Sequence, residues 1–300
     1  MQHSRGSTLK GVVTISLIVL NVLFWVPILM VTALAKLLLP VRRWRLGMSR
    51  VMTRLAELWI ECNGMIFGLT NALRIEARGL AGLSPREWYL VVSNHQSWVD
   101  ILVLQSVFAR RIPFLKFFLK QQLIWVPFLG LAWWALDFPF MRRHTAEYLA
   151  RHPAERGKDL ESTRNACAKF ALLPTSVMNF VEGTRFTAAK RERFESPYRH
   201  LLPPRAGGVA FVLSAMGGVL HSMVDVTIAY REVSPTLWDL CCGRLQPVIV
   251  EVARRPIEAW ATAGSYTEDE QFRRRFQDWL GGIWREKDER LETLLQPGTE

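Results

Sequence analysis

Cysteine is scarce in this sequence of 300 residues, and the few cysteines present are not arranged to hold a metal. They are Cys62, Cys167, Cys241 and Cys242. No two of them form a C-x-x-C pair, and no histidines stand at the distance of a zinc finger. The pattern excludes a zinc finger and a disulfide framework, and it is typical of reduced thiols in a protein facing the cytoplasm. We expect no metal ion and no bound cofactor.

Acidic residues are in deficit. The chain has 27 Asp and Glu against 38 Lys and Arg, a formal net charge of +11 at pH 7. Such an excess indicates a polyanionic partner, either nucleic acid or the anionic lipids of a membrane. The basic residues are scattered, and no helix-turn-helix, RNA-recognition or zinc signature occurs, which argues against nucleic acid. The 12 tryptophans favour a membrane, because indole rings are enriched at its interfaces.

Charged side chains are absent from residues 11–35. This run is longer than the roughly 20 apolar residues that cross a bilayer. A secretory signal is shorter and is soon followed by a small-residue cleavage site, so we expect a retained transmembrane helix. The basic cluster after the run consists of Arg42, Arg43, Arg45 and Arg50. By the positive-inside rule, this larger cluster places the rest of the chain on the cytoplasmic side of the inner membrane.

A second apolar stretch, residues 55–73, contains Glu57 and Glu61. It is short and charged for a span, so a helix in the membrane interface or the return arm of a helical hairpin suits it better. If it inserts, both ends of the hairpin are cytoplasmic; if it does not, the N-terminus lies outside. The sequence therefore predicts a membrane anchor over residues 1–73 and a second domain over residues 74–300.

Beyond the anchor, strand patterns alternate with helix patterns. We expect strands at 71–78, 88–92, 175–181, 221–230 and 247–253, and helices at 97–108, 155–172 and 206–216. Residues 114–140 suit short helices that form an apolar wall. A capping box at Thr267–Glu270 predicts the start of a long charged helix, with a possible break at Gly281-Gly282. This alternation indicates an α/β domain.

The stretch VVSNHQSWVD contains the first chemistry-bearing pair, His95 and Asp100. Two side chains that are five positions apart in the sequence point about 140° apart around an α-helix, so His95 and Asp100 cannot share a helix face. They can meet if His95 lies in the turn after the strand and Asp100 in the first turn of the next helix. A carboxylate on one imidazole nitrogen would leave the other free as a general base. Equally, Ser97 and Asp100 form an S-x-x-D pattern, so Asp100 is also consistent with a helix cap alone.

The stretch FVEGTR follows a predicted strand with Glu182, Gly183, Thr184 and Arg185. Backbone amides in a tight turn and a guanidinium make a site for phosphate. The same residues are consistent with a solvated surface turn.

Two further basic stretches have a functional and a structural interpretation each. Arg142 and Arg143 end an apolar run and suit lipid phosphates or a membrane-interface anchor. Arg205 precedes two glycines and a predicted helix, where backbone amides can hold an anion or simply begin the helix.

Taken in order, these stretches resemble the glycerolipid acyltransferase family. The order is H-x-x-x-x-D, F-M-x-R, E-G-T-R and P-x-R-x-G-G, over about residues 88–230. Within that family the chain looks like the branch that acylates 1-acyl-glycerol-3-phosphate, or lysophosphatidic acid. The resemblance implies a mixed β-sheet flanked by helices, with an N-terminal membrane-embedded segment. It also implies that residues 74–300 are the acyltransferase domain.

The resemblance also assigns roles. His95 would be the general base and Asp100 its orienting partner. Binding of the glycerol phosphate would fall to the third and second motifs, namely Glu182, Gly183, Thr184, Arg185, Arg142 and Arg143. Arg205 stands where the family usually has lysine, and Asp225 where a proline is common near the last strand. The second departure brings the chain closer to members of the lysocardiolipin type.

The implied reaction moves an acyl chain from acyl-CoA or acyl carrier protein to the sn-2 hydroxyl of lysophosphatidic acid. No G-x-S-x-G occurs, so direct transfer is favoured over an acyl-enzyme. Three alternatives stay open at this point. They are another lysophospholipid acceptor (lysophosphatidylglycerol or lysocardiolipin), a non-catalytic membrane scaffold of the same fold, and a membrane-anchored nucleic-acid-binding protein.

Overall fold

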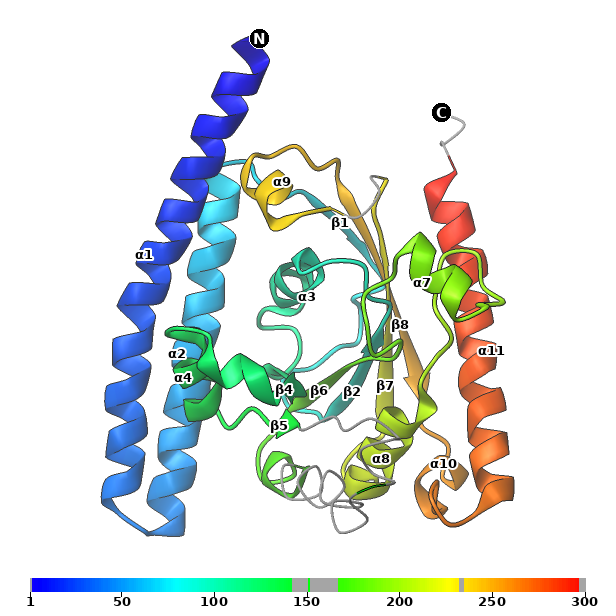
Figure 1. Cartoon of the computed structure of the whole chain (residues 1–300). Coiled ribbons are helices and arrows are strands. Elements are labelled where there is room, and N and C mark those ends of the chain that lie inside the picture. The colour runs from blue at the N-terminus through cyan, green and yellow to red at the C-terminus, as the bar shows by residue number, and fades with distance from the viewer. Residues whose placement is uncertain (1, 142–150, 152–166, 232–234, 297–300) are drawn as a thin grey trace.

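The computed structural model describes residues 2–141, 151, 167–231 and 235–296. Its centre is a six-stranded sheet in the order β1-β8-β7-β2-β6-β3 (Figure 1). The strands are β1 (Ile75–Arg78), β2 (Tyr89–Ser93), β3 (Leu115–Phe117), β6 (Ser176–Phe180), β7 (Ser222–Ala229) and β8 (Val248–Pro256). Strands β7, β2, β6 and β3 are parallel, and β8 runs antiparallel to β7. The predicted α/β class with a mixed sheet is confirmed.

Strand β2 shows why the expected apolar runs became interior strands. All five of its residues are buried. Tyr89 and Val91 pack into the hydrophobic cluster on one face of the sheet, and Leu90 and Val92 into the cluster on the other. A strand covered on both faces is apolar throughout, as in the parallel part of an α/β sheet.

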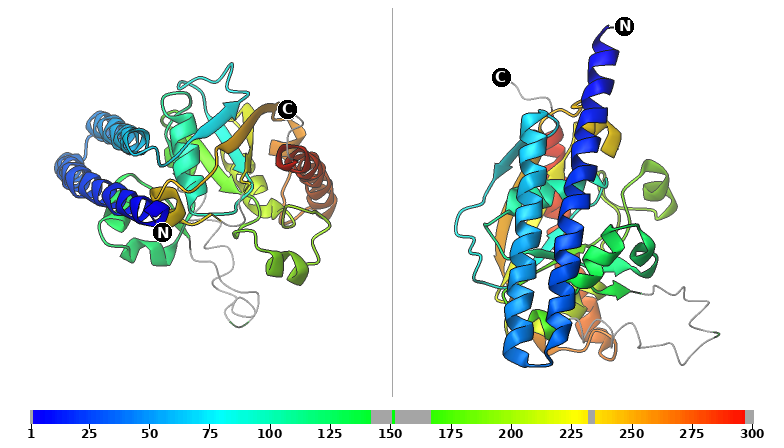
Figure 2. Two further views of the ribbon diagram at one scale, coloured as in Figure 1. Left: turned by 90° about the horizontal axis from the view of Figure 1, so that it is seen from above. Right: turned by 90° about the vertical axis from the view of Figure 1, so that its left-hand side faces the viewer.

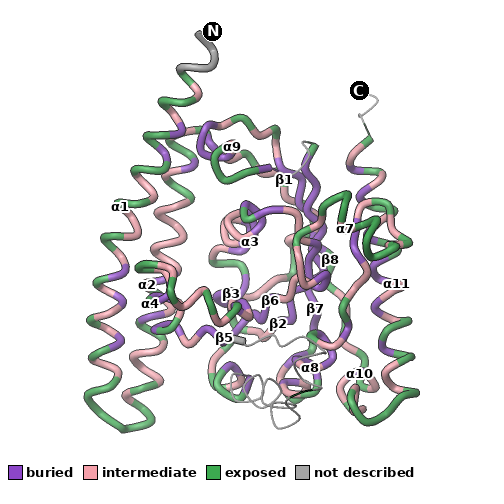
Figure 3. The backbone as a smooth tube through the Cα atoms, viewed as in Figure 1, coloured by how far each residue is buried: buried purple, intermediate pink, exposed green. Residues whose placement is uncertain are grey.

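Helices cover both faces (Figure 2). The helix α3 (Val99–Phe108) packs on the same face as the N-terminal helices, whereas α8 (Ala206–Met216) and α11 (Glu270–Leu295) pack on the other. The shorter helices are α7 (Ala188–Arg193), α9 (Leu237–Cys241) and α10 (Trp260–Ala263). Figure 3 shows the central strands buried between these layers.

The N-terminal segment is a helical hairpin of α1 (Gln2–Leu38) and α2 (Arg42–Leu69), which lie side by side (Figures 1 and 2). The Trp44 indole donates to the Ala35 carbonyl across the bend (2.9 Å), and the Asn21 amide donates to the Asn63 side chain farther along (2.9 Å). The expected basic cluster is thus the first part of the return arm rather than a connection after a span. Pro40 at the bend separates the two helices.

Among the described helices, one is long and apolar enough to cross a membrane, Gly6–Leu38 within α1. Large apolar side chains lie open to the outside along its length, including Val12, Val19, Leu20, Phe24, Val31 and Leu34. The division into an anchor over residues 1–73 and a catalytic domain over residues 74–300 stays a prediction.

Three local predictions differ from the structure. Residues 114–140 form short strands as well as helices, namely β3, β4 (Leu119–Lys120), η1 (Gln121–Trp125), α4 (Leu129–Ala135) and the start of β5 (Phe140–Met141). The expected capping box at Thr267 is absent, because Asp269 caps α11 by accepting from the Phe272 amide (2.9 Å). Helix α11 also continues through Gly281-Gly282, since the residues around them bury against the sheet. The expected helix at 155–172 lies largely outside the described residues.

Candidate active site

The turn after β2 is fixed to the neighbouring strand β7. The side-chain nitrogen of Asn94 donates to the Ile228 carbonyl (2.8 Å), and the backbone amide of Ile228 donates to the side-chain oxygen of Asn94 (2.9 Å). Asn94 is buried, so these bonds are shielded from water. The turn leaves the carboxyl end of the central parallel strand, the edge at which open α/β sheets bind ligands.

His95 and Asp100 meet in this turn. His95 Nδ1 lies 2.8 Å from Asp100 Oδ2. The same carboxylate oxygen accepts from the amides of Gln96 (2.7 Å) and Ser97 (3.0 Å). The chain from His95 to Asp100 therefore wraps around one oxygen atom, which brings together two residues that a continuous helix would keep apart.

The expected cap at Ser97 is half right. Asp100 accepts from the Ser97 amide, as in a capping box. However, the Ser97 hydroxyl accepts from the Val99 amide (3.1 Å) and donates to the Pro235 carbonyl (2.5 Å), and it makes no bond to the Asp100 amide. Helix α3 accordingly begins at Val99, two residues later than expected.

Tyr230, just after β7, completes the environment of Asp100. Its hydroxyl donates to Asp100 Oδ1 (2.6 Å). Burial and the adjacent carboxylate raise the pKa of Tyr230 well above its ordinary value, so it stays a protonated donor. Both carboxylate oxygens of Asp100 are then bonded, and its residue is fully buried. Sequence analysis missed Tyr230.

The imidazole of His95 has one nitrogen committed and one available. Its ring stacks on Phe180, with 3.9 Å between centroids and 14° between planes, and 15% of the side chain is exposed. In the part of the chain that the structure describes, no group bonds to Nε2. A neutral imidazole whose Nδ1–H points at a carboxylate presents Nε2 as a proton acceptor, which is the arrangement of a general base.

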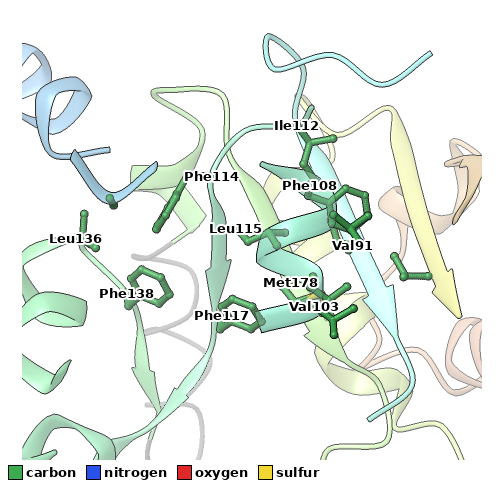
Figure 4. Close-up of a cluster of buried hydrophobic side chains, with 14 of the residues drawn as sticks. Val91, Val103, Phe108, Ile112, Phe114, Leu115, Phe117, Leu136, Phe138 and Met178 are labelled. Carbon is green, nitrogen blue, oxygen red and sulfur yellow. The ribbon is translucent and has the colours of Figure 1, made fainter. Parts of the chain in front are cut away.

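A row of aromatic rings leads from His95 into the core. Phe180 is 6.0 Å from Phe117, which is 6.4 Å from Phe138, which is 5.9 Å from Phe114. Figure 4 shows the last three in the buried cluster with Leu115 and Leu136. The apolar wall expected over residues 114–140 thus reaches Phe180, the ring on which His95 stacks.

The E-G-T-R turn lies beside the histidine turn, because β6 pairs with β2 so that Phe180 stands opposite Ser93. The Phe186 amide donates to the His95 carbonyl (2.7 Å). Glu182 accepts from the His95 amide at Oε1 (3.1 Å) and from the Leu202 amide at Oε2 (3.0 Å). Its side chain is committed to the backbone, and the residue is 1% exposed. Glu182 was expected to contact the glycerol phosphate; here its carboxylate holds the turn that contains His95.

Replacing Glu182 by glutamine should lower the free energy of unfolding by about 1–3 kcal/mol, since an amide nitrogen cannot accept from the second backbone N–H. Burial raises the pKa of Glu182 from 4.5 to about 8, so the folded chain holds this proton more tightly than the unfolded chain. The resulting stability is complete below the unfolded pKa and is lost as pH rises through the folded pKa.

The stability gap between wild type and Glu182→Gln should therefore be larger at about pH 5 than at about pH 8.5. Thermal unfolding in detergent, followed by tryptophan fluorescence, measures this gap at both pH values. An equal gap at the two values would contradict a carboxyl group that titrates between them.

The remaining residues of the third motif are more open to solvent, and Arg185, which is exposed, forms a basic rim with the half-buried Lys190. Gly183 has φ +68°, a conformation that favours glycine. The Arg185 guanidinium lies 5.5 Å from the centroid of the Trp98 ring. Lys190 donates to the Thr184 hydroxyl (2.7 Å) and to the Arg185 carbonyl (2.9 Å). Lys190 was missed in the sequence, where it stands in an ordinary basic helix.

The other predicted basic residues have different fates. The Arg205 amide donates to the Val181 carbonyl (2.8 Å), which joins the fourth motif to the third, and its side chain is exposed at the start of α8. Arg142 and Arg143 lie outside the described residues. Burial and the charges of Arg185 and Lys120 lower the pKa of Lys190, so these three cations lie near one another. Among the described residues, no group of three or more His, Cys, Asp or Glu could hold a metal ion.

The chain matches known proteins over this whole region. A family model described as Acyltransferase matches residues 74–231. An uncharacterised acyltransferase of Schizosaccharomyces pombe is 25% identical over 254 residues, 77% of this chain and 66% of the relative. The 1-acyl-sn-glycerol-3-phosphate acyltransferase gamma of Mus musculus is 25% identical over 226 residues, 71% of this chain and 55% of the relative. The delta form of Homo sapiens is 26% identical over 226 residues, with the same two shares.

Among solved structures, the 1-acyl-sn-glycerophosphate acyltransferase PlsC of Thermotoga maritima matches 99% of this chain and 100% of its own. The TM-score is 0.59 at 15% identity, which is a likeness of fold. The chain spans between about half and two thirds of the length of the curated relatives it matches.

Proposed function

Since this chain belongs to the glycerolipid acyltransferase family, we propose that it is an O-acyltransferase that moves an acyl chain from a thioester to lysophosphatidic acid. The observation that carries the proposal is the bond between His95 Nδ1 and Asp100 (2.8 Å), which leaves Nε2 available beside the basic rim of Arg185 and Lys190. A scaffold has no need of an oriented base next to a cationic rim.

In the proposed reaction, His95 Nε2 takes the proton of the sn-2 hydroxyl as its oxygen attacks the thioester carbonyl. Asp100 stabilises the imidazolium that forms. The tetrahedral intermediate then expels the thiolate, which takes the proton from His95, so an ester and a free thiol leave the site. No residue of the chain carries the acyl group, and acyl-CoA or acyl carrier protein is a substrate, with no bound cofactor needed.

The acceptor is proposed from the exposed cations and from the relatives. A guanidinium grips a phosphate with two parallel hydrogen bonds, and Arg185 is positioned by its contact with Trp98. The mouse and human relatives are named for 1-acyl-sn-glycerol 3-phosphate. The rings of Phe180, Phe117 and Phe138 are the proposed wall for an acyl chain.

We propose that Asp225 serves to dock α11 rather than to select the headgroup. It pairs with Lys287 of α11 (2.5 Å) and with Arg255 (3.0 Å) on the sheet face that α11 covers. The replacement of the family's usual proline by Asp225 is explained by these ion pairs with α11 and β8. This explanation weakens the case for a lysocardiolipin-type acceptor.

The direct test is an acyl-transfer assay with the purified full chain in detergent. Lysophosphatidic acid and palmitoyl-CoA are supplied, and free thiol release and phosphatidic acid are measured. We expect stoichiometric thiol and product, with slower reaction when lysophosphatidylglycerol or lysocardiolipin replaces the acceptor. An acyl carrier protein donor is assayed in parallel. Faster transfer to either other lysolipid would overturn the proposed acceptor, and thiol release without lipid product would overturn the transfer.

Replacing Arg185 by alanine should raise the KM for lysophosphatidic acid about 10–100-fold and leave the KM for palmitoyl-CoA nearly unchanged. A hydrogen bond to a charged group contributes about 1.5–3 kcal/mol, which corresponds to that factor. Arg193, exposed in α7, is the matched control, and Arg193→Ala should change neither constant. Equal increases in both KM values would argue against a grip on the acceptor.

We also propose that the protein resides at the inner membrane, with the catalytic domain in the cytoplasm. Near its two ends, α1 is bonded to the rest of the chain. The Arg244 guanidinium donates to the Ser7 hydroxyl (2.9 Å), and Lys36 pairs with Asp137 (2.6 Å). A helix that is held at both ends lies beside the domain rather than leading away from it. This supports a hairpin seated in one leaflet over a single span, with both ends of the hairpin on the cytoplasmic side.

A further inference from the structure

A second cavity lies at the bend of the α1–α2 hairpin, with a volume of about 360 Å³. Its walls come from the end of α1, the start of α2, the end of α4 and the residues just before β3 and β6. Phe114 and Leu136, two of its apolar wall residues, lie near each other in Figure 4. A volume of this size suits a lipid headgroup or another small molecule.

This cavity is separate from the candidate active site. Thr175 and Phe114 line it and precede the amino ends of β6 and β3, whereas His95 and Glu182 follow the carboxyl ends of β2 and β6. Five residues of parallel strand span about 16 Å. The two sites are therefore at opposite edges of the sheet.

The cavity is strongly basic. Its cationic lining residues are Lys36, Arg42, Arg45, Lys116 and Lys169. Asp137 is the one acidic residue among the described lining residues, and it already pairs with Lys36 (2.6 Å) and Lys169 (3.9 Å). No carboxylate of the described chain lies within ion-pair distance of the other three cations. A ligand of the opposite charge would meet three cations that no described carboxylate pairs with.

Of the three cations, Lys116 gives the strongest indication of an anionic ligand. It lies in β3 between two buried residues, and its ammonium is 4.9 Å from the centroid of the Phe170 ring. No oxygen of the described residues accepts a hydrogen bond from it. Burial lowers the pKa of Lys116 to about 8. A half-buried ammonium with no acceptor among the described residues lowers the stability of the fold, and an anion in the cavity would offset part of that cost.

Apolar surface adjoins the cations. Leu37, Leu38 and Leu39 at the bend are exposed, Leu38 to 75%. Leu46, Met52 and Leu172 form part of the cavity wall. A molecule that fits this arrangement has an anionic head for the cavity and an apolar tail for the outer face of the bend. A free anion would leave the leucines uncovered.

We propose that this cavity binds the phosphate headgroup of an anionic membrane phospholipid, at a site separate from the one for acyl transfer. The bound lipid would hold the bend of the hairpin at the level of the phosphates, with its tails against Leu37–Leu39. The proposal goes beyond the proposed function and does not depend on which lysolipid is the acceptor, because its readouts are binding and stability.

The first experiment compares two double variants of the full chain that remove the same charge from the same helix. Arg42→Ala/Arg45→Ala changes cavity residues, and Arg43→Ala/Arg50→Ala changes exposed residues that do not line the cavity. Binding is measured by flotation with phosphatidylcholine vesicles that contain phosphatidylglycerol. We expect the cavity variant to bind about tenfold more weakly than the control variant. Equal losses in both would mean general attraction to a charged surface and would overturn the proposal.

The second experiment uses Lys116→Met and thermal unfolding in a non-ionic detergent. Without ligand, the variant should unfold at a higher temperature than wild type, because a half-buried charge with no acceptor among the described residues is removed. Dioctanoyl phosphatidylglycerol should raise the unfolding temperature of wild type and not of the variant. An unfolding temperature of the free variant below that of wild type, or a retained response to the lipid, would overturn the proposal.

Two further probes distinguish the source of the phosphate. Inorganic phosphate should give no stabilisation at concentrations where the short-chain lipid does, since it cannot cover the leucines. Adenosine 3′,5′-bisphosphate, which carries phosphates like those of coenzyme A, should also give none. Stabilisation of wild type but not of Lys116→Met by the bisphosphate would assign the cavity to the acyl donor and overturn the lipid assignment.

Discussion

Replacing His95 by alanine should lower kcat for acyl transfer by roughly 10²–10⁴, the usual contribution of a general base. Without the imidazole, the attacking hydroxyl keeps its proton until water removes it. The KM values for both substrates should change little, because Nε2 acts on the hydroxyl proton during attack and the phosphate is held by other residues. Steady-state thiol release at saturating substrates measures the effect.

His221→Ala is the matched control, since His221 is exposed at the other edge of the sheet, just before β7. It should retain wild-type activity. The free energy of unfolding of His95→Ala should lie within about 1 kcal/mol of wild type, because Asp100 still accepts hydrogen bonds from the backbone amides of Gln96 and Ser97. A well-folded His95→Ala enzyme with nearly full activity would remove His95 from the mechanism.

Replacing Asp100 by asparagine should cost nearly as much activity and little stability. The side-chain oxygen of asparagine can still accept from the amides of Gln96 and Ser97, and its amide can donate to the Tyr230 hydroxyl. What is lost is the negative charge beside the imidazole. The imidazolium formed during attack is then less stable, so kcat should fall by about 10²–10³.

Two comparisons separate this effect from helix capping. Asp269→Asn changes a carboxylate that caps α11 far from the site, and it should leave activity unchanged because asparagine caps equally well. Asp100→Ala should instead lower both activity and the unfolding temperature, since the buried Tyr230 hydroxyl loses its acceptor. A stability loss without an activity loss in Asp100→Asn would show that the residue is only a cap.

The interior strands were predictable because a strand that is buried on both faces needs apolar side chains at every position, which gives a continuous apolar run in the sequence. Residues 88–92 and 175–181 are apolar runs, and each end of the observed strands β2 and β6 differs from the predicted end by one residue. The meeting of His95 and Asp100 was also within reach of spacing arguments. Whether Asp100 is a cap or a partner for the histidine was not, because one oxygen atom accepts from both the Ser97 amide and the histidine ring.

Other parts depend on contacts distant in sequence. Tyr230 reaches Asp100 only because β7 lies next to β2 in the sheet, and no local pattern encodes that neighbour. Glu182 looked like a ligand for phosphate because it shares a motif with Arg185, yet its carboxylate is used by the backbone on both sides. Helix α2 begins at Arg42, before the predicted stretch 55–73, and this start was not predictable because the arginines there are equally common in a loop and at the beginning of a surface helix.

The hairpin also bears on where the lipid must go. Pulling a lysolipid out of a bilayer costs about 0.8 kcal/mol for each methylene that is exposed to water. Because α1 is tied to the domain near both ends, by the bond from Arg244 to Ser7 and by Lys36, the fold and not a flexible tether would set the height of the proposed base His95 above the lipid tails. A site carried at fixed depth can meet its acceptor where the acceptor already lies. If the acceptor is the proposed lysolipid, most of that extraction energy would then not enter the activation barrier.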